Sequence, residues 1–149
     1  MPPIYRHDLI VTEDMIDANG HVNNVEYLRW MQDAAIHHTD SNGANLAMKA
    51  IGAIWLARSH RIEYFKSAFR GDHISVLTWI SNFRRVKYLM KYQMIRLEDD
   101  AVLVKAESYW LFADAESGRL RSIPKEVSVA FEVVPLEREK EILGAFISK

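Results

Sequence analysis

A short segment near the N-terminus gathers side chains that can act on a carbonyl group. It reads Asp17-Ala18-Asn19-Gly20-His21-Val22-Asn23-Asn24, and an apolar pattern at helical spacing follows it directly. A carboxylate can drive water onto a carbonyl carbon as a general base, or attack that carbon as a nucleophile. Backbone N–H groups at a helix N-terminus can bind the oxygen charge that develops. We therefore predict a reactive site where this segment meets the helix, with Asp17 in either role.

The other polar residues of the segment have supporting roles in this interpretation. Asn19 and His21 would orient water or the carbonyl group. Asn23 or Asn24 can cap the helix by accepting a backbone N–H bond. The free N–H groups of the first turn would point at a substrate oxygen. We accordingly place Asn24 with the catalytic residues, and Asn23 and Val25 with those that bind substrate.

The same segment also has a purely structural interpretation. An Asp before Asn-Gly is often a turn former whose carboxylate bonds its own backbone. His21 would then only pack the loop, and Asn24 would only cap the helix. Both interpretations place these residues in one loop, so the difference lies in whether the Asp17 carboxylate meets a substrate.

The composition excludes several classes of function. The 149 residues include no cysteine, which removes disulfides, thiolate zinc sites and cysteine nucleophiles. The neighbours His37 and His38 point their rings in different directions on a helix, so we predict no metal and no cofactor. A net charge of -1 gives no overall attraction for nucleic acid or an acidic membrane. No apolar run approaches the ~20 residues that cross a bilayer, so we expect a soluble cytoplasmic protein.

The hydrophobic pattern predicts one α+β domain over residues 1–149. A strand at residues 4–11 precedes the segment, and the helix after it ends at Asn42-Gly43. Alternating patterns predict further strands at residues 53–65, 74–81, 88–94 and 102–112, with a possible short extension at 119–123. Their short connections indicate antiparallel neighbours. A helix is predicted after Pro124 and another at 137–149, and Trp30, Trp55, Trp79 and Trp110 are expected in the core or an interface.

The segment and the helix after it resemble those of hotdog-fold thioesterases. The pattern Asp17-x-Asn19-x-His21-Val22-Asn23-Asn24, followed by Tyr27, Arg29 and Trp30, is similar to 4-hydroxybenzoyl-CoA thioesterase-like bacterial enzymes and to plant acyl-ACP thioesterases. Ile62-Glu63-Tyr64 and Gly71-Asp72 resemble the first long strand of that fold and its turn. The resemblance implies an antiparallel sheet wrapped around one long central α-helix, and hydrolysis of acyl-CoA or acyl-ACP thioesters.

The resemblance also assigns individual residues. Asp17 falls where the bacterial enzymes carry their catalytic carboxylate, while Asn19 and His21 match positions implicated in the plant enzymes. A later Glu of the plant enzymes would fall near Ser67, so the plant constellation is incomplete here. The plant enzymes also have two hotdog domains in one chain. We therefore expect this chain to form a homodimer or homotetramer, in which another subunit completes the cleft.

Substrates of this kind carry phosphates on their carrier arm, so a basic surface near the cleft is expected. The densest basic group follows a predicted strand, and a second lies within the strand at residues 53–65. Either could instead be an ordinary solvated strand end. The two groups are Arg84, Arg85 and Lys87, which we take as substrate-binding, and Arg58, His60 and Arg61 as the second choice.

Two other functions remain alternatives. Hotdog hydratases and dehydratases acting on enoyl or hydroxyacyl thioesters generally pair an Asp with a His five residues later. Here Asp17 and His21 are four apart, which favours a hydrolase. A non-catalytic module that binds acyl ligands would keep the same fold without turnover, and the presence of Asp17 does not exclude it.

Overall fold

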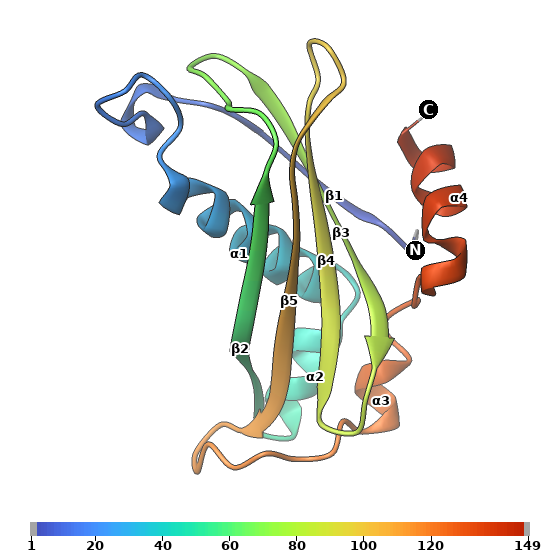
Figure 1. Ribbon diagram of the computed structural model, residues 1–149. Coiled ribbons are helices and arrows are strands. Elements are labelled where there is room, and N and C mark those ends of the chain that lie inside the picture. Colours follow the sequence, from blue (N-terminus) through green and yellow to red (C-terminus); the bar gives the residue numbers. More distant parts are fainter. Residues whose placement is uncertain (1–2, 148–149) are drawn as a thin grey trace.

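Five strands and one long helix form the body of the protein. The computed structural model describes residues 3–147. The strands are β1 (Tyr5–Ile10), β2 (Ala53–Tyr64), β3 (His73–Phe83), β4 (Lys87–Arg96) and β5 (Ala101–Asp114). They form one antiparallel sheet in the order β1-β3-β4-β5-β2, and the helix α1 (Asn24–Ser41) lies against one face of it (Figure 1). The predicted α+β class is confirmed.

The ends and the buried face of α1 follow from the sequence. The Asn23 side chain caps the helix by accepting the Val25 N–H at 3.2 Å. The helix ends at Ser41 with Asn42 as its C-cap, and Gly43 then takes a left-handed φ of 82°, which a residue without a Cβ adopts at no steric cost. The buried residues recur every three or four positions, so one stripe faces the sheet. These residues are Tyr27, Trp30, Met31, Ala34, Ala35, His38 and Thr39.

The sheet buries apolar side chains on both of its faces. The main core lies between α1 and the inner face, meaning the face that α1 covers. A smaller cluster lies on the outer face, where Leu77 and Trp79 pack beneath the C-terminal helix α4 (Leu136–Ile147). Trp30 and Trp79 are buried, and Trp55 and Trp110 pack partly buried against the core. The expected core placement is therefore confirmed for Trp30 and Trp79, whereas Trp55 and Trp110 pack against the core and also line a cavity.

Several local elements differ from the sequence-based prediction. The helix α2 (Ala44–Ala50) and the 3₁₀ turn η1 (Glu13–Met15) were not predicted, because each is too short to show a periodic pattern. The extension at 119–123 forms only an isolated bridge between Ala113 and Leu120. The helix after Pro124, α3 (Lys125–Ser128), is a single turn that stops before Phe131. The predicted terminal helix is present as α4, and residues 148–149 lie outside the described residues.

Strand β2 is an edge of the sheet. It pairs with β5 on one side, and within the described chain no strand pairs with its other side. Apolar side chains are exposed along this edge, including Ile54 and Leu56 on β2 and Ile36 on α1. A long edge with unpaired backbone groups and apolar neighbours favours pairing with another chain.

Stability is expected to fall in mild acid because of His38. Its side chain is 4% exposed, its Nδ1 has no hydrogen-bond partner, and its ring packs against Tyr5 and Phe131. Burial lowers the pKa of His38 to about 4. An imidazole in the unfolded chain has a pKa of ~6.5. The contribution of the neutral His38 ring to the free energy of unfolding is therefore fully present above pH ~6.5 and is lost as the pH falls towards 4.

The free energy of unfolding should therefore drop by about 2 kcal/mol between pH 7 and pH 5 on account of this one group. Urea denaturation at the two pH values measures the drop. His38→Phe keeps an aromatic ring of similar size and removes the titrating group. The same pH dependence in the native protein and in this variant would contradict the assignment.

Candidate active site

The segment at residues 17–24 folds into a tight loop before α1. Backbone bonds close it, since the Asp17 N–H donates to the His21 carbonyl at 2.8 Å and the Gly20 N–H to the Asp17 carbonyl at 3.1 Å. Gly20 has a φ of 81°, a conformation that favours glycine. The Val22 N–H donates to the Ala68 carbonyl at 3.0 Å, which ties the loop to the connection between β2 and β3. The loop is thus held on two sides.

The Asp17 carboxylate has a structural contact on one of its two oxygens. Oδ1 accepts the Asn19 N–H at 2.9 Å and, more weakly, the His21 N–H at 3.3 Å. This contact is the turn-forming role that the structural interpretation of the sequence gave to Asp17. Among the described residues, no group hydrogen-bonds Oδ2. The geometry therefore fixes the carboxylate by one oxygen and leaves the other to meet water or substrate.

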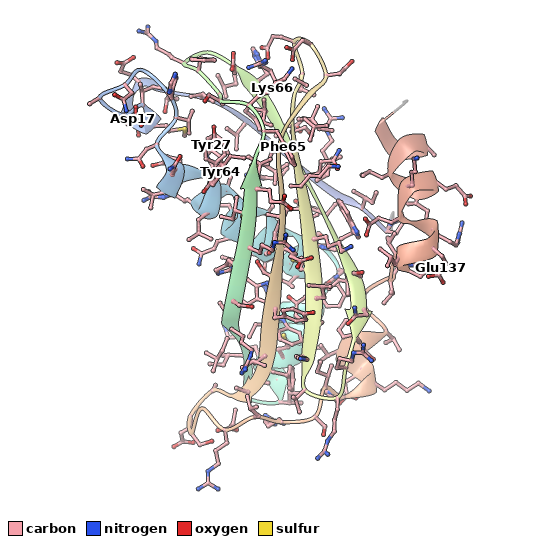
Figure 2. All side chains as sticks on the ribbon, viewed as in Figure 1. Asp17, Tyr27, Tyr64, Phe65, Lys66 and Glu137 are labelled. Atoms are coloured by element: carbon pink, nitrogen blue, oxygen red, sulfur yellow. The ribbon has the colours of Figure 1, made fainter. Side chains whose placement is uncertain are left out.

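The loop forms one wall of a cavity of about 310 Å³. Its other walls come from the first turn of α1, from the end of β2 and from the residues that follow it. Figure 2 shows Asp17, Tyr27, Tyr64, Phe65 and Lys66 at the same end of the molecule. The lining residues are Asp17, Asn19, His21, Val22, Asn24, Tyr27, Tyr64, Phe65, Lys66 and Ser67. All four residues predicted to be catalytic thus meet at one cavity, and their catalytic roles stay predictions.

The helix N-terminus presents one backbone donor beside this cavity. The Val25 N–H is already bound by the Asn23 side chain, and the Glu26 N–H by the Asn23 carbonyl at 2.9 Å. The Asn24 N–H has no acceptor among the described residues, as expected for the first residue of a helix. Of the donors predicted to face a substrate oxygen, the geometry favours Asn24 over Val25.

Tyr27 and His21 are held by aromatic contacts. The Tyr27 hydroxyl accepts the Ala68 N–H at 3.0 Å, and its ring lies edge-on to Tyr64 with 5.3 Å between the ring centroids. Burial raises the pKa of Tyr27, so the phenol is neutral at pH 7 and keeps its proton to donate. The His21 ring packs edge-on against Phe69 at 5.3 Å. His21 thus has the packing role of the structural interpretation while its side chain lines the cavity.

Arg96 stabilises the wall that follows β2. Its guanidinium donates to Asp99 at 2.9 Å, to Asp72 at 3.4 Å and to the Ser67 carbonyl at 3.2 Å. The bond from Arg96 lowers the pKa of Asp99 to about 2. The role of Arg96 was not predicted from the sequence, because its partners lie in two connections that are distant along the chain, β2–β3 and β4–β5. The position near which the plant-type Glu would fall, Ser67, does line the cavity.

The predicted basic cluster lies far from this cavity within the same chain. Strand β3 starts beside Ile10, just before the site loop, and the ten residue steps along its 11 residues, at ~3.3 Å each, carry the chain about 33 Å away. Arg84, Arg85 and Lys87 follow at that far end (Figure 1). Arg85 bonds Ser122 at 3.2 Å, and the Lys87 ammonium lies 5.0 Å from the Tyr109 ring centre. Lys66 is the cation that the structure places in the cavity wall.

A second, more apolar cavity lies further along α1. It has a volume of about 580 Å³ and is bounded by the second half of α1, by α2 and by the start of β2. Aromatic rings form much of the sheet side, namely Trp55, Tyr88 and Trp110. A pocket of this size and character suits an apolar group. This cavity was not predicted from the sequence, because its walls come from elements far apart in the chain.

Two structural findings bear on other kinds of site. In residues 3–147, no three or more His, Asp or Glu side chains gather in a group that could hold a metal ion. Within the same range, every helix is too short or too polar to cross a membrane.

The arrangement of α1 on the five-stranded sheet defines a hotdog-type protein, and comparison with known families agrees. Residues 10–131 match the thioesterase-like superfamily, and the chain belongs to this family. The predicted resemblance and the hotdog fold class are both confirmed. Among curated protein sequences, none matches this chain significantly.

Several solved structures share the fold. A 1,4-dihydroxy-2-naphthoyl-CoA thioesterase from Synechocystis is 16% identical, with a TM-score of 0.76 over 85% of this chain and 94% of that one. A Staphylococcus aureus protein in complex with CoA is 18% identical, with a TM-score of 0.79 over 87% and 82%. The 12:0-ACP thioesterase from Umbellularia californica is 18% identical, with a TM-score of 0.78 over 93% of this chain but only 54% of that one.

Proposed function

We propose that this protein hydrolyses acyl thioesters of CoA or of an acyl carrier protein. The observation that carries the proposal is the cavity lined by both Asp17 and Asn24, whose Oδ2 and backbone N–H have no hydrogen-bond partner among the described residues. One group can drive the attack on a thioester carbon and the other can bind its oxygen. Membership of the thioesterase-like superfamily supports the same chemistry.

The reaction follows from these two groups. The thioester oxygen binds at the Asn24 N–H, where the positive end of the α1 dipole adds to the stabilisation. Asp17 Oδ2 takes a proton from water while the water oxygen bonds to the thioester carbon. The C–S bond then breaks, and the thiol leaves with the proton that Asp17 received. Alternatively, Oδ2 attacks the carbon directly, the C–S bond breaks and releases the thiolate, and water then hydrolyses the resulting anhydride to the acid while the Asp17 carboxylate is regenerated.

The carrier in this proposal is either CoA or an acyl carrier protein. Similar structures include one in complex with CoA and one acyl-ACP thioesterase, and each supports its own carrier only by analogy. Lys66, in the cavity wall, is the cation best placed within the same chain to meet a carrier phosphate. The Arg84 cluster remains a candidate if a second subunit brings it close.

A homodimer that pairs the β2 edges of two chains would bring the partner's Arg84 cluster close to the Asp17 cavity. The unpaired edge of β2 can bond the same edge of a second chain only in an antiparallel sense about a two-fold axis. That operation places the partner's far sheet end, with its Arg84 cluster, beside the Tyr64 end of this chain. The exposed Ile36, Ile54 and Leu56 would be covered at the same time.

A charged substitution beside the β2 edge tests the proposed dimer. Ile36→Glu should shift the protein from dimer towards monomer, because Ile36 is 53% exposed in the single chain and a carboxylate there would be buried by the partner. Light scattering after size exclusion measures the mass. Leu136→Glu is the matched control, since Leu136 on α4 is exposed on the other face of the sheet. A monomeric native protein, or a dimer unaffected by Ile36→Glu, would contradict the proposed interface.

The proposed hydrolysis is tested by thiol release. A panel of short, long and aromatic acyl-CoA thioesters and acyl-ACP substrates is offered to the native protein, which contains no cysteine and so adds no thiol of its own. We expect at least one substrate to be turned over. Release no faster than in buffer across both carriers would contradict the proposal.

A further inference from the structure

A connected group of polar side chains lies on the inner face of the sheet. His60 on β2 is the cross-strand partner of Ser108 on β5, and its Nδ1 lies 2.6 Å from the Ser108 hydroxyl oxygen. Ser108 also hydrogen-bonds the Tyr92 hydroxyl, and the Trp110 indole N–H donates to the same hydroxyl at 3.4 Å. Ser108 and Tyr92 are 1% and 2% exposed. The proposed hydrolytic chemistry uses none of these four residues.

The register places this group on the side that α1 covers. Ser108 is directly opposite Met90 and His60, and neighbours on the same face include Tyr92, Ile62 and Trp110, all of which pack into the main core. His60 therefore lies on the face of the sheet that α1 covers, although its strand is an edge. Pairing of β2 with a second chain would use backbone groups in the plane of the sheet and leave this orientation unchanged.

The group also lies between the two cavities. Tyr64, at the end of β2, lines the Asp17 cavity. Trp110 lines the apolar cavity, and the His60 ring lies 6.1 Å from the Trp110 ring. His60 is four residues before Tyr64, which corresponds to about 13 Å along the strand. His60 lines neither cavity itself, but an acyl chain that ran along β2 from the Asp17 cavity to the apolar cavity would cross the strand at its position.

The chemistry of the group indicates what it would bind. Buried polar atoms in an apolar wall are unfavourable unless each has a partner. Three members satisfy one another, whereas His60 is only partly buried and its Nε2 has no protein partner among the described residues, so this atom is open to water or to a ligand. Burial lowers the pKa of His60, so the ring is neutral at pH 7. With Nδ1 engaged, Nε2 is a single donor or a single acceptor according to the tautomer, and a hydroxyl group can satisfy either.

We propose that His60, held by Ser108, recognises a hydroxyl group on the acyl chain of the substrate at a point remote from the thioester, since His60 lies about 13 Å along β2 from Tyr64 in the wall of the Asp17 cavity. This specificity site rests on the proposed thioester hydrolysis. The substrate class is therefore a medium or long acyl thioester hydroxylated far from its carbonyl, as opposed to one hydroxylated next to it. His60 is a specificity residue here and takes no part in bond breaking.

The test compares three substrates of equal chain length, dodecanoyl-CoA, 3-hydroxydodecanoyl-CoA and 10-hydroxydodecanoyl-CoA. In the native protein, kcat/KM for the 10-hydroxy substrate should exceed that for dodecanoyl-CoA by about tenfold, the worth of one hydrogen bond. The 3-hydroxy substrate should show no such preference. Both His60→Phe and Ser108→Ala should bring the tenfold ratio close to one.

Because each ratio is taken within one preparation, partial loss of folded protein in a variant does not affect it. Glu63→Gln is the matched control, because Glu63 lies on the same strand with its side chain on the outer face, and it should keep the native ratio. A native ratio near one, or an unchanged ratio in His60→Phe, would overturn the specificity site while leaving the hydrolysis intact. Failure to cleave any of the three substrates would overturn the specificity site, and the hydrolysis would fall with it only if the whole panel of short, long and aromatic thioesters also stayed intact.

Discussion

Asp17→Asn is expected to lower kcat for acyl thioester hydrolysis at least ~100-fold, in line with the loss of a general base. The amide oxygen of Asn can still accept the Asn19 and His21 N–H bonds that Oδ1 accepts now. The loop should therefore keep its shape, and only the anionic Oδ2 is lost. Thiol release under saturating substrate measures the effect. Thermal unfolding of the variant should match that of the native protein.

The control for this variant is Asp33→Asn. Asp33 is an exposed carboxylate on α1, outside the residues that line the cavity, so neutralising it changes the net charge by the same amount. Its activity should equal that of the native protein. If Asp17→Asn retained full activity, the Asp17 carboxylate would be only a turn former, and the base would have to be sought elsewhere in the cavity.

Asn24→Pro is expected to reduce kcat by about 10²–10³, the usual effect of removing one donor that binds the developing oxygen charge. Proline has no N–H, and it is well tolerated at the first position of a helix, which is where Asn24 lies. The preceding residue, Asn23, is already extended with ψ 136°, as a residue before proline requires. The variant thus removes one backbone donor with little change in the fold.

A second variant at the same position separates backbone from side chain. Asn24→Ala keeps the N–H and removes the amide, so it should retain most of the activity if the backbone group is the one that acts. The opposite order, with Asn24→Ala the more damaged of the two, would assign the role to the Asn24 side chain. Circular dichroism should show the helix content of both variants to be that of the native protein.

The sequence predicted the elements whose signals are local. Asn23 caps α1 through its own side chain, and Gly43 ends the helix by its backbone conformation, so both ends can be read from a few adjacent residues. The long strands were visible because their alternation runs for many residues. The two-turn helix α2 was missed, because its buried residues Ala44 and Met48 make too short a pattern.

Only the part of the site that is contiguous in the sequence was predicted. Residues 17–24 are contiguous, so their motif could be recognised, whereas Tyr64, Lys66 and Ser67 reach the cavity from the end of β2. Their placement depends on long-range contacts such as the bond from Arg96 to the Ser67 carbonyl. The Arg84 cluster was easy to recognise in the sequence but lies far from the cavity in the same chain. A run of basic residues does not indicate which end of a strand lies near the site.

The most direct test of the central claim is a reaction of the native protein with a cleavable acyl thioester in ¹⁸O-labelled water, followed by mass spectrometry of all products. Thioester hydrolysis predicts free thiol and a carboxylic acid that carries ¹⁸O. An enoyl thioester that gains water while its thioester bond stays intact would instead identify a hydratase. Substrate recovered unchanged, from CoA and ACP carriers alike and at stoichiometric protein, would contradict hydrolysis and leave a binding module.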